Sequence, residues 1–146
     1  MICLNSIKKN SKYKHDISVH LNEGSDGSVD YLKRSGIKFN HSVNNLGLCK
    51  GANSAASLAE TDYIIYAHDD MYFLPNWDFF LEQEVKKVTN NLYYFSGTMI
   101  GPKGCGFLEF DCGSTADNFN EKKLLNSYQK FNFYDHQGSH WAPHLI

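Results

Sequence analysis

One stretch, residues 63–77, constrains the fold and the chemistry of this chain more than any other. It begins as an apolar run rich in aromatic and branched residues, the composition of a buried strand. The run stops at two adjacent carboxylates, Asp69 and Asp70, and Pro75 with Asn76 then marks the start of a helix. Acids at the carboxyl end of such a strand lie at the rim where open α/β sheets bind ligands. Hard cations such as Mg²⁺ take oxygen ligands, so the pair predicts a metal site, with a solvated acidic turn as the alternative.

The composition is that of an ordinary globular domain. The 146 residues are 42% hydrophobic and 21% charged, and a net charge of −2 gives no general attraction to nucleic acid. No apolar run approaches the roughly 18 residues of a membrane span, and no signal peptide is visible, which favours a cytoplasmic location. The cysteines lack paired C-x-x-C spacing, so we expect free thiols in a reducing compartment at Cys3, Cys49, Cys105 and Cys112.

Short strands alternate with helical segments in the first half of the chain. Residues 2–12 have the pattern of the end of an amphipathic helix, and residues 15–22 alternate like a strand. Ser28 is predicted to cap a short helix that Gly36 ends, and residues 37–41 form a second strand.

The second half continues this alternation. A turn at residues 44–47 opens a helix whose inward stripe is Leu48, Ala52, Ala55, Ala56 and Ala59. A helix over residues 76–88 is expected to bury Trp77, Phe80, Leu81, Val85 and Val88. Residues 92–100 read as a strand, 101–114 as a loop, 120–130 as a helix and 131–146 as irregular or extended chain. The alternation predicts βαβ units and a mostly parallel sheet flanked by helices.

Taken in this order, the turns resemble those of the family 2 nucleotide-sugar glycosyltransferases, which have the GT-A (Rossmann-like) fold. The matching pieces are Asn22-Glu23-Gly24-Ser25-Asp26-Gly27, Asn45-Leu46-Gly47, Gly51-Ala52-Asn53, His68-Asp69-Asp70 with Pro75 and Trp77, and His140-Trp141-Ala142-Pro143. The resemblance implies one GT-A domain over residues 1–146, with a nucleotide-sugar-binding part over about 15–100. It implies transfer of a sugar from a nucleotide-diphosphate sugar to a glycan or lipid-linked acceptor.

The resemblance also implies roles for single residues. Asn22 stands where the family has an Asp that reads the nucleobase, so it implies a base or ribose contact, with a turn-capping Asn as the alternative. Asp70 matches the last acid of the family's Asp-x-Asp motif and would bind Mg²⁺ or Mn²⁺, while His68 replaces the first acid. The remaining sugar-nucleotide candidates are Glu23, Asp26, Lys50, Asn53 and Asp69. Asp26 is better explained by its own turn, and Lys50 by a solvated surface.

The same comparison implies a domain that is incomplete at both ends, without the family's first strand and without the acidic motif that carries the catalytic base. Such a chain is expected to be marginally folded and inactive alone. The spare acid/base candidates are Asp111, Asp117, Asp135 and His136. Two other functions stay open: a non-catalytic remnant that binds nucleotide diphosphate weakly or not at all, and a nucleotidylyltransferase, which shares the architecture. Peripheral membrane association also stays open.

Overall fold

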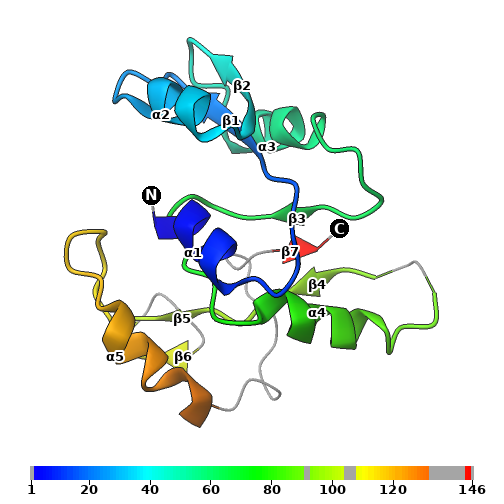
Figure 1. The fold of residues 1–146 in the computed structure, drawn as a ribbon, viewed down its shortest axis with the longest axis vertical. Coiled ribbons are helices and arrows are strands. Elements are labelled where there is room, and N and C mark those ends of the chain that lie inside the picture. The colour runs from blue at the N-terminus through cyan, green and yellow to red at the C-terminus, as the bar shows by residue number, and fades with distance from the viewer. Residues whose placement is uncertain (1, 91–92, 104–107, 132–143, 146) are drawn as a thin grey trace. The chain divides into compact units, whose positions relative to one another are not determined.

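The computed structural model describes residues 2–90, 93–103, 108–131 and 144–145 of this mixed α/β protein (Figure 1). The chain divides into two compact units, one formed by residues 15–64 and the other by residues 1–14 together with 65–146. No helix among the described residues is both long and apolar enough to cross a membrane.

The unit of residues 15–64 is a β–α–β–α segment. Strands β1 (Ser18–Asn22) and β2 (Lys38–Ser42) pair in parallel, and α2 (Ser28–Ser35) connects them (Figure 1). The predicted parallel pair is confirmed. Gly36 ends α2 in the left-handed conformation at φ 68°, as expected, because glycine carries no Cβ that would clash there. The expected Ser28 cap is wrong: Gly27 is the cap residue, at φ 89°, and no side chain caps the helix.

Helix α3 (Leu48–Ala56) packs on the polar face of this strand pair. Ser18 Oγ donates to the carbonyl of Ala55 at 2.9 Å, and Asn40 Nδ2 donates to the carbonyl of Ser54 at 2.6 Å. The polar side chains of both strands therefore hold the helix. The small residues of α3 permit this because they let its backbone carbonyls approach the strands.

In the other unit, α1 (Ile2–Asn10) is hydrogen-bonded to the segment that leads into α4 (Trp77–Val85). Phe73 N donates to Ser6 Oγ at 3.0 Å, and Asn10 Nδ2 donates to the carbonyl of Phe73 at 2.6 Å. Asn76 N donates to the carbonyl of Asn10 at 2.7 Å. Phe73, Ser6 and Asn10 are all buried, so these bonds form in a partly dry environment where they are strengthened.

The sheet of this unit differs from the predicted parallel one. Strand β7 (His144–Leu145) lies between β3 (Ile65–Tyr66) and β4 (Phe95–Ser96) and runs antiparallel to both. The predicted strand over residues 92–100 is two short strands, β4 and β5 (Ile100–Gly101), and β5 pairs in parallel with β6 (Leu108–Glu109) inside the predicted loop. The helix expected over residues 120–130 is confirmed as α5 (Glu121–Leu125) followed by a 3₁₀ turn (Tyr128–Lys130). Residues 140–143 lie outside the described part.

Two predicted inward side chains are exposed. Leu48 in α3 is 60% exposed and Phe80 in α4 is 57% exposed, so both assignments were wrong. Leu48 is the first residue of its helix, ahead of the turn that meets the strands. On α4 the buried position is Asp78, because its carboxylate bonds backbone N–H groups of residues 12 and 13. Cys3, Cys49 and Cys112 are free thiols, as expected, and Cys105 lies outside the described residues.

Candidate functional site

The carboxyl end of β1 is held by the side-chain oxygen of Asn22. This Oδ1 accepts from Leu46 N at 2.9 Å, lies 3.2 Å from Ser42 Oγ and lies 3.2 Å from His20 Nε2. Asn45 Oδ1 accepts from Gly47 N at 2.8 Å and closes the turn that Asn22 supports. The oxygen of Asn22 therefore does the turn-capping work that the sequence left as an alternative to a ligand contact.

His20 is a site residue that the sequence reasoning missed. Its Nδ1 lies 2.7 Å from Asn40 Oδ1, and its Nε2 lies 3.1 Å from Ser42 Oγ. A Cβ placed on Gly51 of α3 would lie 3.1 Å from the imidazole, so the ring fills the space beneath this glycine. In the sequence His20 is only one of the polar residues that alternate with apolar ones along this strand. Both β1 and β2 have a polar residue at every second position, and this pattern could have indicated the hydrogen-bond network around His20.

The turn after β1 contains Glu23 and Asp26. Glu23 takes φ 62°, its N–H donates to the carbonyl of Ser42 at 2.8 Å, and its side chain is exposed. Asp26 Oδ1 accepts from Ser28 N at 3.0 Å, and the hydrogen bonds from Ser28 lower the pKa of this carboxyl. Asp26 thus serves its own turn, as the sequence indicated. Glu23 has no such structural task for its carboxylate in the described part of the chain.

Lys50 and Asn53 are both exposed on α3, one on each side of the buried Gly51 in the sequence. Three residues apart on a helix, they are neighbours on one surface. Asn22 and Glu23 follow one another at the carboxyl end of β1, and the hydrogen bond from Leu46 N to Asn22 Oδ1 brings the start of α3 beside them. No side-chain contact among the described residues joins Lys50 or Asn53 to this pair.

His68, Asp69 and Asp70 belong to the other unit and form a turn closed by Met71 N and the carbonyl of His68 at 3.4 Å. Both carboxylates are exposed, and neither has a hydrogen-bond or ion-pair partner among the described residues. Burial, and then the charges of Asp69 and Asp70, raise the pKa of the Cys3 thiol to about 11.

These residues are suited to one kind of cation site. No group of three or more His, Cys, Asp or Glu residues in the described ranges could enclose a metal ion. Two free carboxylates do fit an ion such as Mg²⁺, which uses one or two carboxylates and takes its other oxygens from phosphate and water. Any cation held at this turn would therefore need further oxygen ligands from phosphate or water.

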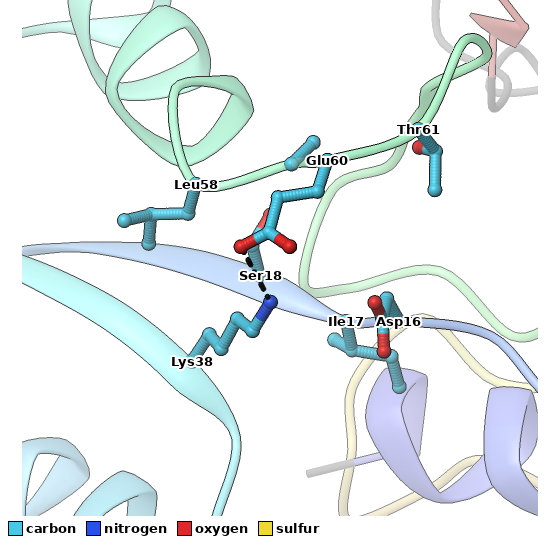
Figure 2. A pocket seen from close by; sticks show the side chains of 8 residues that line it. Asp16, Ile17, Ser18, Lys38, Leu58, Glu60 and Thr61 are labelled. Atoms are coloured by element: carbon cyan, nitrogen blue, oxygen red, sulfur yellow. Dashed lines mark hydrogen bonds and ion pairs between the residues drawn. The ribbon is translucent and has the colours of Figure 1, made fainter.

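A hollow in the unit of residues 15–64 lies away from these candidates (Figure 2). Lys38 and Glu60 form an ion pair at 3.4 Å across it. It opens at the amino ends of β1 and β2, and a strand rises about 3.3 Å per residue, so Asn22 lies roughly 13 Å along β1 from Ser18. Open α/β sheets bind ligands at the other strand ends, which separates this hollow from the candidate site. It is lined by Asp16, Ile17, Ser18, Lys38, Leu58, Ala59, Glu60 and Thr61.

The surroundings of Asp111 and Asp117, the spare acid/base candidates within the described residues, do not indicate a catalytic role. Asp111 Oδ1 accepts from Gly113 N at 2.8 Å and shapes a turn, and Asp117 is exposed. Asp135 and His136 lie outside the described residues.

Comparisons with known proteins identify the family. The model of glycosyl transferase family 2 matches residues 2–137, which include every candidate named above for the sugar nucleotide and the metal. Searches against curated proteins and against solved structures gave no match. With nearly its whole length matched, the chain belongs to glycosyl transferase family 2.

Proposed function

We propose that this protein transfers a sugar from a nucleotide-diphosphate sugar to a glycan or lipid-linked acceptor, on a GT-A fold. Family membership over residues 2–137 supports this reaction class. The observation that carries the metal assignment is that Asp69 and Asp70, three and four residues after the end of β3, have exposed carboxylates with no partner among the described residues. A cytoplasmic location is part of the proposal, because activated sugars are made there.

The chemistry explains why carboxylates are needed at that turn. When the sugar leaves, negative charge develops on the diphosphate, and a bound Mg²⁺ or Mn²⁺ would stabilise it electrostatically. Asp70 would hold the ion, with Asp69 or His68 in support. Two adjacent like charges repel one another, and neither is offset by a Lys or Arg in the described residues, so the turn attracts a cation.

The second group of residues would bind the nucleotide part of the substrate. Asn22 and Glu23 lie at the carboxyl end of β1, and Lys50 and Asn53 lie on the exposed side of α3. An exposed lysine and an amide are suited to phosphate and hydroxyl groups. Asp26 contributes by fixing the turn beside them.

Calorimetry of Mn²⁺ binding to the 146-residue chain, with and without UDP or GDP, tests the proposal. Mn²⁺ should bind measurably only when the nucleotide diphosphate is present, and Asp70→Asn should abolish this dependence. Asp62→Asn, which neutralises another exposed carboxylate, is the matched control and should bind like the parent. Equal binding by Asp70→Asn would remove Asp70 from the metal site. A folded chain that binds neither nucleotide would instead be a non-catalytic remnant.

A further inference from the structure

We infer that His20 is a pH-sensitive switch, which holds the turn at residues 44–47 more tightly when its imidazole is protonated. The inference goes beyond the proposed function and does not depend on it. Every contact that carries it lies within the unit of residues 15–64.

Both ring nitrogens of His20 face amide oxygens whose positions are fixed by backbone groups. The carbonyl of Ser54 can only accept, so the Asn40 atom 2.6 Å from it is Nδ2, and Asn40 Oδ1 faces His20 Nδ1 at 2.7 Å. The N–H of Leu46 can only donate, so the Asn22 atom 2.9 Å from it is Oδ1. The same oxygen lies 3.2 Å from His20 Nε2. Since an amide oxygen only accepts, each ring nitrogen faces a group that requires a donor.

A neutral imidazole can satisfy only one of these two oxygens, because it carries a single N–H. With the proton on Nδ1, His20 donates to Asn40 at the shorter distance, and the lone pair of Nε2 faces Asn22 Oδ1. The hydroxyl of Ser42, 3.1 Å from Nε2, then donates to that nitrogen. Among the described contacts, Asn22 Oδ1 is left with a hydrogen bond from Leu46 N alone.

Protonation of His20 removes this conflict. The imidazolium carries a hydrogen on both nitrogens, so Nε2 donates to Ser42 Oγ and no longer presents a lone pair to Asn22. The hydroxyl of Ser42 can then donate to Asn22 Oδ1, 3.2 Å away. Both lone pairs of this oxygen are now used, one by Ser42 and one by Leu46 N, and the hydrogen bonds in series polarise one another. The side chain that anchors the turn is therefore held more firmly.

The ring is enclosed by polar, uncharged groups. A Cβ on Gly51 of α3 would lie 3.1 Å from the imidazole, so the ring packs against the helix. The charged and titratable side chains on the elements around it are exposed, and within the described residues none bonds to the ring: Glu23 after β1, Lys38 and His41 on β2, and Cys49 and Lys50 on α3. The charge of the imidazole itself is thus the variable that changes the network.

NMR of the ¹⁵N-labelled 146-residue chain tests the inference with two readouts. The ring nitrogen shifts of His20 report which nitrogens carry a hydrogen. The protection factor of the Leu46 amide in hydrogen exchange reports how tightly the turn is held, after correction for the intrinsic effect of pH. Histidine side chains change charge between about pH 5 and 8, so the titration covers that range. Protection of Leu46 should be roughly 2- to 10-fold higher in the protonated state, the equivalent of one further hydrogen bond, and should be lost as pH rises through the His20 titration.

Two variants separate His20 from the other groups that titrate. His41→Gln is the matched control, because the neighbouring His41 contacts the carbonyl of Glu23 at 2.8 Å and takes no part in the network. Leu46 protection in this variant should follow pH as in the parent. In His20→Gln the side chain cannot titrate, so Leu46 protection should be independent of pH.

The parent chain alone can overturn the inference, whether or not His20→Gln folds. Leu46 protection that stays constant while the His20 ring titrates would overturn it, and so would a ring that does not change its protonation between pH 5 and 8. A folded His20→Gln variant that keeps the pH dependence of the parent would overturn it as well.

Discussion

The buried carboxylate of Asp78 accepts the backbone N–H of Tyr13 at 2.8 Å. Its other oxygen accepts the N–H of Lys12 at 2.8 Å, so one side chain at the start of α4 fixes the chain that leaves α1. In the sequence Asp78 is only an acid in the first turn of a predicted helix. The contact makes it a tertiary connection between segments more than 60 residues apart.

Replacing Asp78 by Ala should therefore destabilise the protein strongly. Loss of charge-assisted bonds to two backbone N–H groups, which then lack a partner, should cost about 2–4 kcal/mol. Chemical denaturation of the full chain measures the free energy of unfolding. Asp62→Ala removes an exposed carboxylate and should change it by less than about 0.5 kcal/mol. Equal effects of the two substitutions would contradict the role of Asp78.

Phe80 and Phe73 provide a second comparison. Phe80 is 57% exposed, whereas Phe73 is 5% exposed and its ring lies 4.6 Å from that of Trp77. Phe73→Ala should cost about 3–5 kcal/mol because it opens a cavity in packed surroundings. Phe80→Ala should cost less than about 1 kcal/mol, because most of its surface already contacts water. A large loss of unfolding free energy in Phe80→Ala would mean that the Phe80 side chain is buried, as helical periodicity predicted.

Local signals in the sequence accounted for most of the elements. Some signals determine the structure of only the few residues around them, so that structure can be predicted without knowing the rest of the fold. Examples are the glycine after α2, the Asn45-Leu46-Gly47 turn and the residue spacing along α3. The parallel pairing of β1 with β2 follows because α2 connects them. These features were predicted with the correct type and nearly the correct bounds.

The pairing of strands that lie far apart in the sequence could not be predicted from these local signals. Ile65 pairs with Leu145, and no local pattern states which strands meet across 80 residues. His20 was missed for a related reason, since alternation alone cannot tell whether the polar face of a strand meets water or a helix. The two carboxylates after β3 could be named as metal-site candidates from residue type alone, and their role stays a prediction.

The contact of α3 with β1 can be tested by overpacking it. A leucine at Gly51 would place its Cβ 3.1 Å from the His20 ring and add further atoms where the strand already lies. We expect a loss of about 1–3 kcal/mol, and a similar loss for Ala55→Leu, since both positions approach the sheet. Asn53→Leu on the exposed side of the same helix is the control. If all three variants had the same melting temperature as the parent, α3 would not dock on the strands through this face.

The Cys3 thiol gives the last prediction, a loss of stability at alkaline pH. Burial first, and then Asp69 and Asp70, raise its pKa from 9.0 to about 11. Above pH 9 the unfolded chain releases this proton while the folded chain retains it, so the unfolded state binds fewer protons and stability falls as pH rises. The contribution is fully present below pH 9 and is lost as pH passes through about 11. Cys3→Ala should remove this part of the slope, measured as the difference between the unfolding free energies of parent and variant across that range.

A second readout of the same thiol tests its proximity to the two carboxylates. Asp69→Asn with Asp70→Asn removes the negative charge that opposes the thiolate, so carbon NMR of labelled cysteine should show a lower pKa for Cys3. The value should stay above 9.0, because burial is the larger cause and is unchanged. Asp62→Asn should leave the Cys3 titration where it is. An identical titration in the double variant would mean that the turn at residues 68–71 does not lie beside the start of α1.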